Sequence, residues 1–255
     1  MMPFSPEGRR RMNTRLDKLL VNLGLFDSRA RAQAAIAAGL VTVEGHPARS
    51  ASQSVAEDAV ITATEAHPWV GRGALKLVAA LELWPITVEG RVVLDVGAST
   101  GGFTEVALSR GAARVYAVDV GREQLHARLA TDPRVVDLQG TDARTLEASL
   151  IPEAPGLIVT DLSFISLTKA LGPALALAAP AADLIALVKP QFEQDSRAAI
   201  GKGGLVTDPA ARQAALDKVS VWLEGQGWHL HETAESPIVG GDGNREWLLW
   251  ATCSV

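Results

Sequence analysis

The stretch that decides the fold class is residues 91–119, "RVVLDVGASTGGFTEVALSRGAARVYAVD". Residues 92–96 form a short apolar run, which is typical of a strand buried on both faces of a sheet. A glycine-rich loop follows, then a helical pattern over 101–111 and a second apolar strand over 114–119. Parallel strands need a crossover connection, usually a helix, so this order predicts a parallel α/β sheet.

The same alternation continues toward the C-terminus. Helical patterns cover 122–130 and 208–227, and apolar runs typical of strands cover 135–141, 156–164, 183–189, 228–236 and 246–254. We therefore expect an α/β fold with a doubly wound, Rossmann-like sheet of about seven strands that ends in an antiparallel pair. Ligands of such folds bind at the carboxyl ends of the strands.

One stretch is long and apolar enough to be mistaken for a membrane span: "ALGPALALAAPAADLIALV", residues 170–188. Pro173, Pro180 and Asp183 interrupt it. A helix, a turn and a buried strand therefore account for it better than a bilayer-spanning helix, and we expect no membrane association.

The compartment is predicted from the cysteine count and from the N-terminus. Cys253 is the single cysteine of the 255 residues, which excludes a disulfide framework and a zinc cluster. The N-terminus lacks the apolar core of a signal peptide, whether Met1 or Met12 is the start. A reducing, cytoplasmic compartment fits both observations.

Charge divides the chain into two parts. Residues 1–64 hold eight Lys and Arg against six Asp and Glu, a net charge of +2, whereas the remainder holds 16 against 23, a net charge of −7. A basic N-terminal part joined to an acidic remainder suggests that the N-terminal part binds a polyanion.

The basic N-terminal part contains two short helical patterns and a hairpin. Thr14 is expected to cap the first helix, which Gly24 closes, and Ser28 is expected to cap the second, which ends at Gly39. "LVTVEGHPA", residues 40–48, then reads as a strand, a Glu-Gly turn and a second strand.

The order and spacing of these elements over about residues 14–62 resemble the S-four (S4) domain, a small RNA-binding module. The resemblance implies that basic side chains of the two helices meet structured RNA, mostly at phosphates. The alternative is that these charges are only solvated helix faces. The expected RNA-binding residues are Arg15, Lys18, Arg29, Arg31, Arg49 and, beyond the module, Arg72.

Carboxylates stand at the ends of three successive expected strands. Asp119 lies 24 residues after Asp95, the usual place for a carboxylate that grips ribose hydroxyls. Asp95 suits a positively charged group, such as the amino end of a methionine moiety, and Asp142 could bond an adenine amino group. Together with the glycine loop they resemble the S-adenosylmethionine site of Rossmann-like methyltransferases; an NAD or other nucleotide site is the alternative. The resemblance implies a cofactor-binding set of Asp95, Gly97, Ser99, Gly101, Gly102, Phe103, Asp119 and Asp142.

Four further charged residues lie close to expected element ends. Asp161 and Lys189 end strands, Glu246 begins the last strand, and Lys76 lies on a helix before the first strand of the sheet. Each alone has an ordinary structural explanation, as a surface charge or a turn cap. In this order, beside a methyl-donor site, they resemble the Lys-Asp-Lys-Glu tetrad of the FtsJ-type RNA 2′-O-methyltransferases.

The combination resembles the haemolysin-A/TlyA family over about residues 14–252, through the motifs "GASTGGFT", "DLSFISL", "VKPQFE" and "GKGGLVTDP". The resemblance implies methylation of a cytidine 2′-hydroxyl in ribosomal RNA, with Lys76, Asp161, Lys189 and Glu246 as catalytic residues. His67, Pro68 and Trp69 predict a short, stiff linker at 65–71, so we expect three parts: an RNA-binding domain at 12–64, this linker, and a methyltransferase domain at 72–255.

Lys189 ends an apolar strand, where a charge is costly without a partner or a task. We expect it to accept the proton of the ribose hydroxyl or to stabilise the alkoxide. Asp161 and Glu246 are its expected partners. Asp161 would orient it, while Lys76 and Glu246 would position the ribose and the second charge. No metal is expected.

Three other functions remain open at this stage: a small-molecule methyltransferase, an RNA-binding ribosome-assembly factor, and a membrane-active haemolysin. The expected partners are ribosomal RNA or ribosomal subunits, with no obligate protein partner. The sequence leaves open which RNA and which nucleotide are modified.

Overall fold

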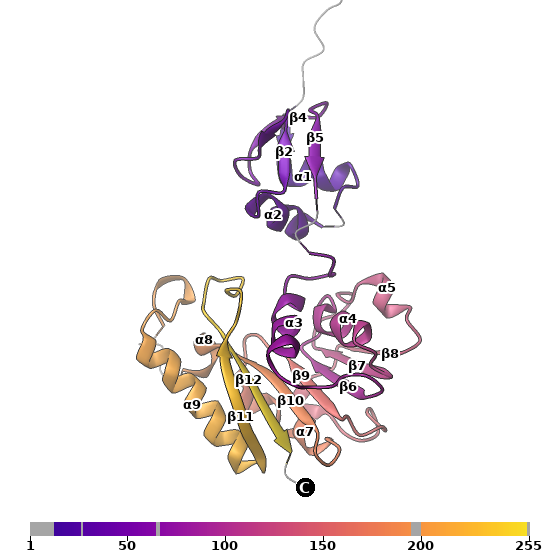
Figure 1. Cartoon of the computed structure of the whole chain (residues 1–255), viewed down its shortest axis with the longest axis vertical. Helices are drawn as coiled ribbons and strands as arrows, with labels where there is room; N and C mark the ends of the chain where they lie inside the picture. Colours follow the sequence, from indigo (N-terminus) through magenta and orange to yellow (C-terminus); the bar gives the residue numbers. More distant parts are fainter. Residues whose placement is uncertain (1–12, 27, 65–66, 195–199, 254–255) are drawn as a thin grey trace, which may run out of the picture. The chain divides into compact units, whose positions relative to one another are not determined.

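The computed structural model describes residues 13–26, 28–64, 67–194 and 200–253. The chain divides into two compact units between Pro68 and Trp69 (Figure 1). The alternative starts, Met1 and Met12, lie outside the described residues.

The first unit is a small α+β fold. Its elements are β1 (Asn13–Arg15), α1 (Leu16–Asn22), α2 (Arg29–Ala37), β2 (Val41–Val43), β3 (His46–Pro47), β4 (Ser54–Ala56) and β5 (Ile61–Ala63). β1 pairs with β4, and β2 lies between β3 and β5. The core is built by Leu16, Leu19, Leu20, Phe26, Ala32, Ala35, Ile36, Val41 and Val55.

Two of the expected details of this unit are confirmed and one is wrong. The Ser28 side chain accepts a hydrogen bond from the Arg31 backbone N–H at the start of α2. Glu44 and Gly45 both have positive φ, as a two-residue hairpin turn requires. Thr14 does not cap α1: it pairs with Val55 as part of β1, so its extended backbone serves a sheet, and α1 begins at Leu16 without a side-chain cap.

The second unit contains a seven-stranded sheet of order β11-β12-β10-β9-β6-β7-β8. The strands are β6 (Val92–Val96), β7 (Arg114–Asp119), β8 (Val135–Gln139), β9 (Leu157–Thr160), β10 (Asp183–Val188), β11 (Trp228–Glu235) and β12 (Trp247–Cys253). β6 to β10 are parallel neighbours, whereas β12 runs antiparallel to both β10 and β11. The expected doubly wound sheet with a final antiparallel pair is confirmed.

Helices cover both faces of this sheet (Figure 1). One core joins it to α3 (Ala74–Leu83), α4 (Gly102–Ser109) and α5 (Ala127–Ala130). The other joins it to α6 (Leu167–Ala170), α7 (Gly172–Ala176) and α9 (Pro209–Gly225). The short α8 (Pro190–Glu193) follows β10 directly. Because β6, β7, β9 and β10 are parallel, the loops after them meet at one edge of the sheet.

The structure shortens one expected helix and shows how the apolar stretch 170–188 is divided between elements. The helix expected over 122–130 is only the four-residue α5, because Glu123 has a positive φ and its backbone N–H donates to the Gln139 side chain instead of forming a helical turn. The apolar stretch 170–188 is the end of α6, then α7, a turn and β10. None of the helices in the described part of the chain is long and apolar enough to cross a membrane.

Candidate functional site

The loop after β6 needs glycine at two positions for different reasons. Gly97 has a φ of 91°, and a Cβ there would lie 3.3 Å from the Asp161 carbonyl. A Cβ on Gly102 would lie 3.1 Å from the Ala74 backbone nitrogen. The loop therefore passes close to the backbone of two other segments, and a side chain at either position would force those segments to shift.

A cavity of about 600 Å³ lies beside this loop. It is lined by the loops after β6, β7, β8 and β9, including Gly97, Ser99, Asp119, Val120, Thr141, Asp142, Asp161, Leu162, Ser163, Phe164 and Ile165. Gly97, Ser99, Asp119 and Asp142 of the expected cofactor-binding set thus face one space. A smaller neighbouring cavity of about 220 Å³ is lined by Gly102 and Phe103 of that set.

Asp119 and Asp142 have different environments at the first cavity. Asp119 accepts hydrogen bonds from the backbone N–H groups of Ser99 (2.8 Å) and Gly121 (2.7 Å). Asp142 forms an ion pair with Arg144 at 2.6 Å, and the hydrogen bonds from that guanidinium lower the pKa of Asp142 to about 2. Asp142 is therefore ionised and oriented by its neighbour.

Asp95 is not among the residues that line these cavities. It is fully buried in β6, where one carboxylate oxygen accepts a 2.7 Å hydrogen bond from the Thr104 hydroxyl. Its other oxygen has no hydrogen-bond partner in the described part of the chain. Burial raises the pKa of Asp95 to about 7. The structure therefore places Asp95 below the loop, against α4.

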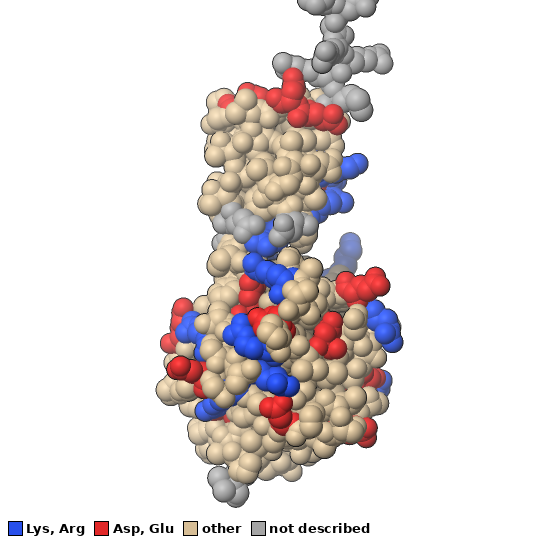
Figure 2. Space-filling view, turned by 90° about the vertical axis from the view of Figure 1, so that its right-hand side faces the viewer, with Lys and Arg blue, Asp and Glu red and all other residues tan. Residues whose placement is uncertain are grey.

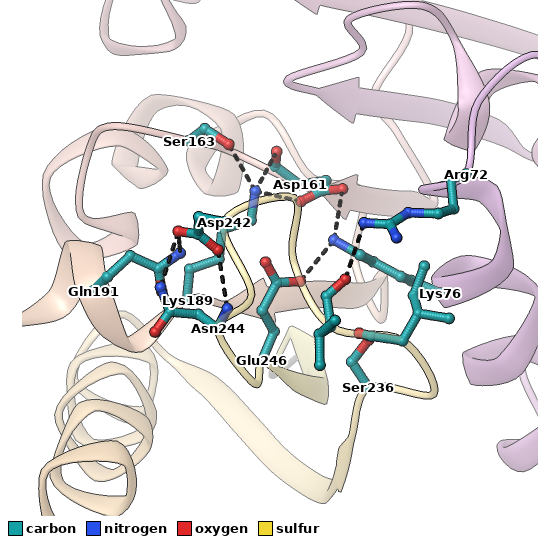
Figure 3. Close-up of polar contacts among 12 residues, drawn as sticks. Arg72, Lys76, Asp161, Ser163, Lys189, Gln191, Ser236, Asp242, Asn244 and Glu246 are labelled. Atoms are coloured by element: carbon teal, nitrogen blue, oxygen red, sulfur yellow. Dashed lines mark hydrogen bonds and ion pairs between the residues drawn. The ribbon is translucent and has the colours of Figure 1, made fainter. Parts of the chain in front are cut away.

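The four tetrad residues come together at the edge of the sheet (Figure 3). Lys76 reaches in from α3 and contacts Asp161 at 3.3 Å and Glu246 at 2.6 Å, measured from Nζ to the nearest carboxylate oxygen. Lys189 contacts the other oxygen of Asp161 at 2.6 Å. The order of contacts is Glu246, Lys76, Asp161, Lys189. Of the two expected partners of Lys189, Asp161 is found in contact with it, whereas Glu246 forms its ion pair with Lys76, which reaches it from α3.

Burial makes this chain of charges unusual. Lys76, Lys189 and Glu246 are each less than 10% exposed, and the Asp161 side chain is 19% exposed. Burial raises the pKa of Glu246 above its ordinary value, while the ammonium groups of Lys76 and Lys189 oppose that rise. Alternating charges at short range are what make such a buried arrangement tolerable.

A third cavity, of about 420 Å³, lies against the tetrad. Lys76, Asp161, Lys189 and Glu246 line it together with Arg72, Gly73, Ser163, Phe164, Gln191, Phe192, Ile238, Gly241 and Asp242. Asp161 and Ser163 line all three cavities. The space beside the glycine loop and the space beside the tetrad therefore meet at these two residues.

Two residues of the segment after β9 are functional candidates that the sequence reasoning did not single out. Ser163 accepts a 2.7 Å hydrogen bond from the Lys189 ammonium group. Phe164 is 91% exposed and has a positive φ, and its ring centroid lies 5.4 Å from that of Phe192. The quoted motif "DLSFISL" contained both, but an exposed aromatic ring cannot be told from a core residue by pattern alone.

Glu193 links the segment after Asp161 to the segment after Lys189. This buried carboxylate follows Lys189 by one helical turn and accepts hydrogen bonds from the Ser166 hydroxyl (2.5 Å) and the Leu167 backbone N–H (2.7 Å). Ser166 and Leu167 belong to the segment that follows Asp161. Glu193 therefore holds the loop after β9 against the end of β10.

The basic residues of the first unit are organised by a buried carboxylate. Arg15 and Arg29 both hydrogen bond to Asp17, at 3.0 Å and 2.7 Å, and Gln33 does so at 2.8 Å. The Arg15 guanidinium is the largest influence that keeps the pKa of Asp17 well below its usual range. Both arginine side chains are about half exposed, so each presents part of its guanidinium to solvent.

The other expected RNA-binding residues are divided between the two units. Lys18 and Arg49 are exposed and Arg31 is half-buried on the first unit. Figure 2 shows basic and acidic side chains gathered at different ends of that unit. Arg72 belongs to the second unit, where it is exposed, lines the second and third cavities and donates to the Val239 carbonyl at 3.2 Å.

No group of three or more His, Cys, Asp or Glu residues that could hold a metal ion occurs within the described ranges.

Comparison with known proteins assigns families to both units. The FtsJ-like methyltransferase family matches residues 69–253, and the S4 domain family matches residues 14–61. The chain is 45% identical to the 16S/23S rRNA (cytidine-2′-O)-methyltransferase TlyA of Mycobacterium tuberculosis, over 92% of this chain and 88% of that protein. It is 36% identical to Hemolysin A of Brachyspira hyodysenteriae, over 92% of this chain and 98% of that protein.

A solved structure supports the same relationship. "Putative hemolysin from Streptococcus thermophilus" superposes with a TM-score of 0.76 and 34% sequence identity, covering 96% of this chain and 90% of that chain. The similarity therefore extends over both units of the protein.

Proposed function

The chain belongs to the FtsJ-like methyltransferase family and carries an S4 domain, and from that premise we propose that it transfers a methyl group from S-adenosylmethionine to the ribose 2′-hydroxyl of a cytidine in ribosomal RNA. The observation that carries the proposal is the buried Glu246-Lys76-Asp161-Lys189 chain at the junction of the cavities. The relative from M. tuberculosis supplies the substrate class through its name.

The residues at the glycine loop suit S-adenosylmethionine. Gly97 and Ser99 of the loop line the 600 Å³ cavity together with Asp119 and Asp142, whose carboxylates offer acceptor oxygens there, and Arg144 keeps the pKa of Asp142 low. Asp119 would hold ribose hydroxyls, and Asp142 would accept from the adenine amino group. When bound, S-adenosylmethionine supplies an electrophilic methyl group on a sulfonium.

Lys189 acts on the nucleophile in this proposal. A ribose hydroxyl is a weak nucleophile until its proton is removed or its developing negative charge is stabilised. Lys189 lies at the junction of the cavities, where its Nζ is fixed by Asp161 and Ser163. Lys76 is held between Asp161 and Glu246 and supplies the second positive charge. Groups held in place in this way lower the entropic cost of reaching the reactive geometry.

We expect residues of both units to contact the RNA. We assign residues 12–64 to RNA binding, 65–71 to the linker and 72–255 to methyl transfer. Arg15, Lys18, Arg29, Arg31, Arg49 and Arg72 would contact phosphates, which contributes affinity without reading sequence. The exposed ring of Phe164 beside the tetrad would stack on the target base, as aromatic side chains do with unstacked bases. The reaction would take place in the cytoplasm, where ribosomal subunits are.

The test is methyl transfer to ribosomal RNA. Ribosomal subunits from a strain that lacks the gene, and the RNA extracted from them, are incubated with the protein and labelled S-adenosylmethionine. We expect label at a cytidine 2′-oxygen, mapped by resistance of the adjacent phosphodiester to alkaline cleavage. RNA binding without transfer to either substrate would overturn the proposal in favour of an assembly factor.

A further inference from the structure

The third cavity contains a second group of polar side chains that the tetrad does not use. Gln191 follows Lys189 by two residues, and its side-chain NH₂ group donates to Asp242 at 2.9 Å (Figure 3). Asn244 donates to the same carboxylate through its side chain (2.9 Å) and its backbone N–H (3.1 Å). Gln191 and Asp242 both line the cavity.

The orientation of the Gln191 amide follows from its partner. Asp242 can only accept, so the Gln191 nitrogen must face it and the Gln191 oxygen must face away. That oxygen has no hydrogen-bond partner in the part of the chain that is described, although the residue is only 9% exposed. A buried acceptor without a donor is costly, which points to a donor supplied by a ligand.

Asp242 also retains capacity for a donor. Its two oxygens can accept about four hydrogen bonds, and Gln191 and Asn244 use three. Although burial opposes ionisation, the hydrogen bonds from Asn244 and Gln191 lower the pKa of Asp242. Gln191 and Asp242 therefore bring two neighbouring acceptors to the wall of the cavity, one of them ionised.

We propose that Gln191 and Asp242 form the acceptor pair that selects cytosine, by receiving the two hydrogens of its 4-amino group. Uracil carries a carbonyl oxygen at that position, so it would place an acceptor against two acceptors. A carboxylate that accepts from the cytosine amino group is an established form of base recognition, and a site built to pair with an amino group rejects an analogue that lacks it. This inference rests on the proposed function and adds to it the residues that choose the base.

The experiment compares cytidine with uridine at the target. After the methylated position is mapped on ribosomal RNA, two transcripts are made that differ only in C or U at that position. The ratio of kcat/KM for the two is measured for the wild type and for Asp242→Asn. Asp217→Asn is the matched control, since this substitution removes the same charge from an exposed position on α9.

We expect the wild type and Asp217→Asn to prefer cytidine by about tenfold to a hundredfold, the range of one good base contact. Asp242→Asn should lose or invert the preference, because the substitution replaces one of the carboxylate's two acceptor oxygens with an NH₂ donor. A wild type that methylates both transcripts equally, or an Asp242→Asn variant that keeps the full preference, overturns the inference. Failure of the wild type to methylate either RNA overturns the proposed function instead.

Discussion

Replacement of Asp95 by Asn should change how the stability of the second unit depends on pH. Asp95 is completely buried, and only one of its oxygens has a hydrogen-bond donor among the described residues. Its pKa of about 7 lies far above the ordinary value of 3.8. The folded chain therefore keeps a proton on Asp95 that the unfolded chain has released between about pH 4 and pH 7.

The sign and size of the effect follow from this difference. Because the folded state binds more protons, stability falls as pH rises through that window. A full shift of this size corresponds to about 4 kcal/mol, at roughly 1.4 kcal/mol for each unit of pKa. Between pH 5 and pH 8 the wild type should lose about 2–3 kcal/mol that Asp95→Asn does not lose, since Asn does not ionise.

Tryptophan fluorescence isolates the unit concerned, because all six tryptophans lie at or after position 69. Urea unfolding at pH 5, 6, 7 and 8 gives the free energy of unfolding for the wild type and Asp95→Asn, with Asp217→Asn as the control for a lost surface charge. Comparing the two curves removes every other titrating group that they share. Parallel curves for the wild type and Asp95→Asn across this range would refute the reasoning.

Three further predictions concern catalysis and RNA binding. Lys189→Ala should lower single-turnover methylation by about 10²–10⁴-fold with donor affinity retained in calorimetry; a near wild-type rate would sink its assigned role. Phe164→Ala should reduce kcat/KM by about 5- to 100-fold through lost base stacking, while Phe164→Tyr retains activity; equal loss in both variants would argue against stacking. Arg29→Ala should weaken RNA binding and lower the slope of log affinity against log salt by about one, and an unchanged slope would exclude a phosphate contact.

Much of the fold was predictable because its signals are local. The apolar runs of β6, β7, β9 and β10 and the glycine loop after β6 report burial and tight turns directly. The errors also have local causes. Thr14 is a good helix cap by residue type, but pairing with Val55 across β1 and β4 uses its backbone instead. The expected helix over 122–130 is shortened by the positive φ of Glu123.

The candidate site was only partly predictable. The resemblance to the FtsJ-type tetrad pointed to Lys76, Asp161, Lys189 and Glu246, but the expected pairing of Lys189 with Glu246 was wrong, since Glu246 contacts Lys76. That pairing depends on where α3 and the strand ends lie in space. Phe164, Gln191 and Asp242 were missed because exposure and an unsatisfied acceptor are properties of packing, which a sequence pattern does not contain.

The sequence by itself determined the alternation of strands and helices, the two-part organisation and the residue types available at the strand ends. These follow from periodicity and from the chemistry of single side chains, both of which act over a few residues. The tertiary structure alone decided that Asp95 is buried beneath the loop and that Lys76 bridges Asp161 and Glu246. It also decided that the side-chain oxygen of Gln191, beside Asp242, has no hydrogen-bond partner among the described residues. Lys76 and Glu246 are 170 residues apart in the sequence, and their contact exists only once α3 has packed against the finished sheet.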